Sequence, residues 1–256
     1  MEMDMKKALA VMMCAWMLGS SAAFALDNGI DFEITTDFFS KYVWRGQVLT
    51  DDPVWQPGIS MAYGGFTAGI WANMDLDGTF SGDFTEVDYY LDYSGSLTET
   101  IGYSVGYIYY NFPEVLTSGG DTQEVYAGLS LDTFLSPSVT FYYDFDAVEG
   151  CYVAFGAGHS IDDFFNISED LPVGLDISVN VGYADSDYNA AYWSVADSGF
   201  NDLTLSIGFP MELMGWSVTP SLNYMTLLDG DIRTQAASDG KDNEVFFTGI
   251  SLGTSF

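Results

Sequence analysis

The sequence predicts an all-β fold, a transmembrane antiparallel up-and-down β-barrel of about 12 strands. Three observations predict it. The chain begins with an export signal, continues in alternating segments of about ten residues, and closes with an alternating strand that ends on Phe256.

The export signal occupies the first 25 residues. Lys6 and Lys7 precede an uncharged run over residues 8–18, and Ala23-Phe24-Ala25 has the small residues of a cleavage site. A membrane helix is the alternative, but this run is short of the ~20 apolar residues that a helical span needs. We therefore expect a signal peptide over residues 1–25 and a barrel domain over residues 26–256.

Charge and cysteine content narrow the possible partners. The chain has 6 Lys and Arg against 37 Asp and Glu, a formal net charge of -31. Such acidity argues strongly against nucleic acid as a partner. Cys14 lies inside the signal, so the mature chain keeps Cys151 alone and forms no intrachain disulfide.

Alternation with a period of two recurs from Ile30 to the end, and it divides into twelve segments. The first, residues 30–44, places apolar side chains on one face and charged ones on the other. Gly64-Gly65 joins the second and third segments as a tight hairpin. Each segment is long enough to cross a bilayer as a tilted strand, with one face towards lipid and one towards a lumen.

The connections alternate in length, which is separate support for a barrel. Short links follow even-numbered segments and long links follow odd-numbered ones, as in barrels with both termini in the periplasm. Two links break the rule, since residues 147–150 are short where a long loop is expected and residues 161–172 are long where a short turn is expected.

The final segment, residues 244–256, is expected to pair with residues 30–44 and close the barrel. A terminal Phe on such a strand is typical of outer-membrane barrels, so we expect contact with the barrel-assembly machinery and with outer-membrane lipid. The bacterial outer membrane is the expected location. The alternative is the last strand of a secreted β-sandwich.

The charged residues collect on the face opposite the apolar rows. The residues predicted to line a pore are Glu33, Asp37, Lys41, Arg45, Asp75, Glu86, Asp88, Asp92, Glu124, Asp132, Asp144 and Asp176. A lumen of this composition favours cations. The alternative is that several of these acids lie at the mouths and are merely solvated. Outward aromatic residues suit interfacial girdles or are ordinary strand formers; they are Tyr42, Trp44, Tyr63 and Trp216.

Three function classes remain. A passive porin-like channel for small cationic or neutral solutes is favoured. The alternative is a structural or surface-interaction barrel whose lumen is filled by inward side chains, namely Trp71, Tyr90, Tyr110, Tyr126 and Tyr142. A membrane-embedded hydrolase is least favoured, because the one histidine, His159, falls on the lipid face. We predict no catalytic residue, cofactor or metal site, since the acidic loops lack calcium-loop spacing.

Arg45 is expected to act as a clamp at the external mouth. It would hold two or three carboxylates from the second to fourth strands through forked hydrogen bonds, with Gly46 turning the backbone sharply beside it. The alternative is a solvated loop arginine without a partner.

The run Ser40-Lys41-Tyr42-Val43-Trp44-Arg45-Gly46-Gln47, with Asp52-Pro53, Gln56-Pro57 and residues 65–73 after it, resembles the opening of the Gcw_chp family of uncharacterised proteobacterial outer-membrane proteins. The hallmark is an aromatic-Arg-Gly at the end of the first strand, matched here by Trp44-Arg45-Gly46. The resemblance is specific over about residues 35–77. It implies a barrel and supplies no substrate.

Overall fold

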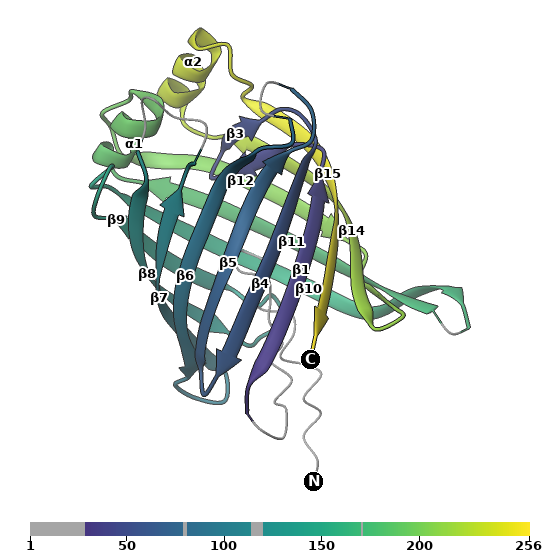
Figure 1. The fold of residues 1–256 in the computed structure, drawn as a ribbon. Coiled ribbons are helices and arrows are strands. Elements are labelled where there is room, and N and C mark those ends of the chain that lie inside the picture. Colours follow the sequence, from purple (N-terminus) through teal and green to yellow (C-terminus); the bar gives the residue numbers. More distant parts are fainter. Residues whose placement is uncertain (1–28, 79–80, 114–119, 170) are drawn as a thin grey trace.

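The computed structural model describes residues 29–78, 81–113, 120–169 and 171–256, and these close into an antiparallel barrel (Figure 1). The expected signal peptide, residues 1–25, lies outside the described residues. Within the described part, twelve strands form the wall: β1 (Asp31–Phe39), β4 (Val54–Tyr63), β5 (Phe66–Asp75), β6 (Phe84–Ser96), β7 (Ile101–Asn111), β8 (Thr122–Leu131), β9 (Ser138–Asp144), β10 (Cys151–Ser168), β11 (Leu171–Ala184), β12 (Gly199–Gly208), β14 (Trp216–Leu227) and β15 (Glu244–Ser255).

Closure follows from the pairing at the two ends of the chain. β1 pairs with β4 on one side and with β15 on the other. β12 pairs directly with β14, and the short strand β13 (Met211–Leu213), in the connection between them, pairs with the start of β14. The rings of Phe32 and Phe256 stack across the seam with centroids 6.3 Å apart. The prediction of a closed twelve-stranded antiparallel barrel is confirmed.

The two rims of the wall differ. Short turns and the C-terminus lie at one rim, called the turn end below, and the longer connections gather at the other, called the loop end (Figure 1). The loop end carries α1 (Ser186–Trp193) and α2 (Gly230–Ser238), which begin at the N-cap carboxylates of Asp185 and Asp229. Neither of these helices is long and apolar enough to cross a membrane.

The first predicted strand is too long. β1 ends at Phe39, and the chain then leaves the wall to form a separate hairpin of β2 (Tyr42–Trp44) and β3 (Gln47–Thr50). Tyr42 and Trp44 were expected to face lipid, but Tyr42 is buried and Trp44 packs against the interior clusters. Alternation alone could not reveal this, because the hairpin keeps the same period of two.

The predicted long link over residues 161–172 is also wrong. Most of it is strand, since β10 and β11 continue pairing beyond their neighbours, with a register shift between Ile161 and Phe165. This two-stranded extension projects beyond the rest of the wall (Figure 1). Pro172 is tolerated there because the ladder from β11 to β12 begins only at Asp176, so its missing N–H interrupts no pairing on that side.

Two apolar clusters fill the loop end of the barrel. One combines the hairpin of β2 and β3 with α2 and neighbouring strands. Its buried members are Phe39, Tyr42, Val43, Val54, Trp71, Trp193, Met225, Leu227, Ile232, Ala236, Val245 and Phe247. The other is rich in tyrosine and comprises Ile108, Tyr110, Tyr126, Tyr142, Tyr152, Ala154, Ala184 and Tyr188. The core of this protein therefore lies inside its barrel.

The seam offers a test of this packing. A Cβ added at Gly249 would lie 2.1 Å from the ring of Phe39, its partner across the β1–β15 ladder, whereas one at Gly253 would meet nothing within 4 Å. We expect Gly249→Ala to destabilise the barrel by ~1–3 kcal/mol through overpacking, and Gly253→Ala to be nearly neutral. The midpoint of heat-induced mobility change on a gel measures both variants, and equal midpoints would contradict the observed packing at the seam.

Candidate functional site

The hairpin of β2 and β3, residues 42–50 and called the inner hairpin below, lies within the loop end of the barrel. Its turn is Arg45-Gly46, and both residues have positive φ, 44° and 80°. These angles suit the tight turn of a two-residue hairpin. A Cβ at Gly46 would lie 2.8 Å from the Cβ of Asp202 on β12, so only glycine lets the turn approach the wall so closely.

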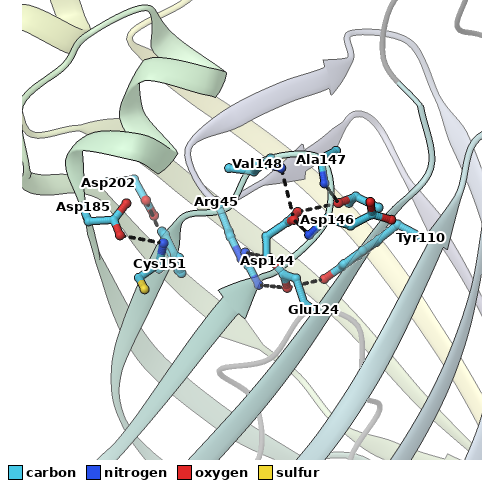
Figure 2. Close-up of polar contacts among 12 residues, drawn as sticks. Arg45, Tyr110, Glu124, Asp144, Asp146, Ala147, Val148, Cys151, Asp185 and Asp202 are labelled. Carbon is cyan, nitrogen blue, oxygen red and sulfur yellow. Dashed lines mark hydrogen bonds and ion pairs between the residues drawn. The ribbon is translucent and has the colours of Figure 1, made fainter.

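Arg45 forms a forked ion pair with Glu124 of β8. Its Nη1 donates to Oε1 at 2.7 Å and its Nη2 donates to Oε2 at 2.8 Å (Figure 2). The hydroxyl of Tyr110 on β7 donates to the same Oε2 at 2.8 Å. The two ion-pair side chains are only 9% and 2% exposed. A buried pair with this geometry holds the inner hairpin to the wall.

Aromatic rings surround the guanidinium. Its Cζ lies 4.5 Å from the ring centroid of Trp44, 4.2 Å from that of Tyr142 and 4.6 Å from that of Tyr152. Rings at such distances stabilise a cation that has left water. Tyr152 is itself fixed, because its hydroxyl donates to Oδ1 of Asp202 at 3.0 Å.

The charge on Arg45 is secure in this setting. Burial lowers the pKa of the guanidinium, but the charge of Glu124 and its hydrogen bonds raise the pKa, and the net value lies well above the ordinary one. The guanidinium of Arg45 therefore stays charged although it is buried. Arg45 has one carboxylate partner on β8, and not several on the second to fourth strands as expected from the sequence.

Asp144 shapes a turn at the loop end. Its Oδ1 accepts from the backbone N–H groups of Asp146 and Val148 at 3.0 and 3.1 Å, and its Oδ2 accepts from the hydroxyl of Thr122 at 2.6 Å (Figure 2). Nearby, Asp185 accepts from the backbone N–H of Cys151 at 2.9 Å as well as capping α1. These two carboxylates accept hydrogen bonds from backbone N–H groups and so stabilise the local conformation of the loops.

The other acidic residues that were predicted to line the pore and that lie on the wall have inward-facing side chains. Asp92 accepts from the hydroxyl of Tyr126 at 2.7 Å, and Asp75 accepts from that of Thr50 at 3.0 Å. The remaining inward carboxyls are Glu33, Asp37, Glu86, Asp88 and Asp176. Glu86 and Asp88 are buried close to the inner hairpin, while Glu33, Asp37 and Asp176 are partly exposed.

Besides Arg45, two more predicted pore residues are not on the wall. Lys41 follows the end of β1 and pairs with Asp51 across the base of the inner hairpin, where both side chains are partly solvated. Asp132 lies just beyond β8 and is exposed in the short turn to β9. Both errors come from extending the alternation past the point where the strand ends.

Sequence reasoning missed Tyr152 and Asp202 as partners of the inner hairpin. Both lie on inward rows at the loop-end portions of β10 and β12. The alternation of side chains along each strand could have identified both as inward-facing. What it could not show was that Arg45 is folded into the barrel and reaches them.

The comparisons with known proteins agree with this architecture. The chain belongs to the Gcw_chp family, described as a bacterial protein of unknown function, whose model matches residues 25–209. No curated protein matches the chain.

Several solved structures share the fold. An outer-membrane channel from Pseudomonas putida F1 is similar with a TM-score of 0.54 and 10% identity, over 93% of this chain and 100% of that one. LpxR from Salmonella typhimurium is similar with a TM-score of 0.52 and 10% identity, over 88% and 99% of the two chains. The KdgM porin is similar with a TM-score of 0.50 and 9% identity, again over 88% and 99%. The chain thus has the fold of outer-membrane β-barrels.

Proposed function

We propose, from the premise that this chain is a Gcw_chp-family outer-membrane barrel, that it is a passive channel for small cationic or neutral solutes. Its lumen is acidic and is narrowed at the loop end by the inner hairpin. The names of two similar structures, a porin and a channel, agree with the proposal. At 9% and 10% identity these similarities show the fold alone.

The observation that carries the proposal is the charge of the inner face. Glu33 and Asp37 on β1, Asp92 on β6 and Asp176 on β11 all lie on inward rows below the inner hairpin. The Arg45 guanidinium is committed to Glu124 at the loop end. The field along the lumen is therefore negative, which draws cations in and repels anions.

A structural or surface-interaction barrel is the second candidate. The apolar clusters at the loop end favour it, because their buried tyrosines and the inner hairpin occupy much of the cross-section there. In that case the barrel would present α1 and α2 to the outside and pass no solute.

We propose no enzymatic function. The ring of His159 packs on that of Phe134, with centroids 4.1 Å apart, and its Nδ1 lies 2.8 Å from the carbonyl oxygen of Phe134. That contact lies at the turn end, on the outer face, because His159 pairs with the outward Ile177. A general base at this position could not reach the buried acids of the loop end.

Planar-bilayer recording distinguishes the two candidates. Purified protein is expected to give discrete current steps, and a tenfold KCl gradient is expected to give a reversal potential of cation-selective sign because the lumen is negative. The same preparation after heat denaturation is the control. Reproducible anion selectivity would contradict the acidic lumen, and the absence of steps in several salts would favour the structural barrel.

A further inference from the structure

Two carboxyl side chains lie side by side inside the barrel beneath the inner hairpin. Glu86 and Asp88 share the inward face of β6 and are 4% and 1% exposed. Across the ladders, Asp88 is the partner of Trp71 on β5 and of Tyr110 on β7. The pair is thus enclosed by aromatic rings and removed from water.

Within the described residues neither carboxylate oxygen of Asp88 accepts a hydrogen bond of normal geometry, and its one donor contact is with the backbone N–H of Asn111. The neighbouring side-chain donors of Tyr110 and Asn73 are already used. Tyr110 donates to Glu124 at 2.8 Å, and the amide of Asn73, which pairs with Glu86, donates to Thr85 at 2.8 Å. A buried carboxyl without donors costs several kcal/mol unless something else satisfies it.

The inner hairpin adds a third oxygen. The ring of Tyr42 packs on that of Trp71 with centroids 5.7 Å apart, and the Tyr42 hydroxyl is buried without a hydrogen bond of normal geometry. Burial raises the pKa of this phenol well above its usual value, and the charges of Glu86 and Asp88 raise the pKa further. The Tyr42 hydroxyl thus lies close enough to interact with both Glu86 and Asp88.

Every basic side chain in the described part of the chain is engaged elsewhere. Lys41 pairs with Asp51, Arg45 with Glu124 and Arg233 with Glu244, and Lys241 lies over the ring of Trp193. No protein cation is left to neutralise Glu86 and Asp88. The charge must be balanced by protons or by an ion from solution.

We propose that Glu86, Asp88 and the Tyr42 hydroxyl bind one alkali-metal cation, Na⁺ or K⁺, at this position while the two carboxyls keep one proton between them, so that the charge is balanced. Oxygen ligands suit such hard cations. In the described residues no group of three or more His, Cys, Asp and Glu side chains is placed to hold a metal ion, so a tight divalent site is not built here. The site deepens the proposed channel and rests on it for a physiological role, because the channel would supply the cations that the site binds.

The test measures stability and needs no current. The midpoint of heat-induced mobility change is recorded at fixed pH and ionic strength while N-methylglucamine chloride is replaced by NaCl or KCl. Because a ligand bound only to the folded state raises the midpoint, we expect a rise of about 3–6 °C in the small cation. Asp88→Asn is expected to abolish that rise, and the exposed loop variant Asp242→Asn is the matched control and should keep it.

Tyr42→Phe removes one oxygen and keeps the ring that packs on Trp71. In this variant the rise of the midpoint is expected to need a higher cation concentration. If Asp88→Asn fails to insert, this shift in Tyr42→Phe is the test of the site. A midpoint that follows pH but ignores the identity of the cation would overturn the proposal in favour of protonated carboxyls. A cation-dependent midpoint in a protein that gives no current would keep the site and defeat the channel.

Discussion

Replacing Arg45 with alanine is expected to loosen the inner hairpin while leaving the barrel inserted. Glu124 would then keep a buried carboxylate whose remaining partner is the hydroxyl of Tyr110. Breaking a buried pair in this way costs ~3–5 kcal/mol. The twelve-stranded ladder does not involve Arg45, so the loss should act on the inner hairpin. We expect a larger and noisier single-channel current and faster proteolysis near residues 42–50.

The controls separate charge from geometry. Lys41→Ala removes an exposed pair worth ~0–1 kcal/mol and should change neither measurement. Arg45→Lys keeps the charge but cannot make two parallel hydrogen bonds to one carboxylate, so it should fall between wild type and alanine. Current and proteolysis that are unchanged in Arg45→Ala would show that the apolar clusters alone hold the hairpin.

Excising the inner hairpin should produce the largest change in conductance. Phe39 and Val54 are partners in the β1–β4 ladder, so residues 40–53 can be replaced by an Asn-Gly turn that joins the two strands directly. The excision is combined with Glu124→Gln to avoid leaving a buried charge. A barrel of this size freed of its inner hairpin is expected to conduct several-fold more, on the order of 3–10 times, because its width lies between filled and open barrels.

A matched variant keeps the length of the loop. In it residues 42–50 are replaced by glycine and serine, so that the connection remains but its packing side chains are gone. Both variants should retain heat-modifiable mobility and both should conduct more than wild type. If both insert and neither conducts more, the constriction lies elsewhere in the lumen and the inner hairpin is not part of it.

The wall was predictable because its chemistry repeats in every strand. In segments such as residues 84–96, side chains alternate because one face of the strand meets lipid and the other meets the lumen. This pattern can be recognised in each segment without knowing which strands pair with it. The turn at Gly64-Gly65 was equally local, and both glycines have positive φ. The extension of β10 and β11 was missed because Asp162-Asp163 and Pro172 are typical of loops, and only the absence of neighbouring strands makes them tolerable in a strand.

The candidate site was predictable only in part. That Arg45 needs a carboxylate followed from its charge and from the acidic row, but Glu124 is 79 positions away and nothing local indicates it. Period-two alternation reads the same for a strand in the wall and for a hairpin folded inside it. α1 and α2 did leave a signal in the Asp residues that cap them, Asp185 and Asp229, which could have indicated helices within the long loops.

The position of the inner hairpin in the chain has a consequence for the order of folding. It follows β1, the strand of the seam, and its Tyr42 and Thr50 contact β5, yet the residues around its Arg45-Gly46 turn belong to β8, β9, β10 and β12. Those residues surround one point only after most of the sheet has curled. Until then, bringing Arg45 to Glu124 would cost the closure of a loop between residues 79 positions apart, without the aromatic contacts that surround the guanidinium in the closed barrel. The hairpin is therefore acquired late, and the ring of aromatic residues around Arg45 is completed after the wall that supplies it.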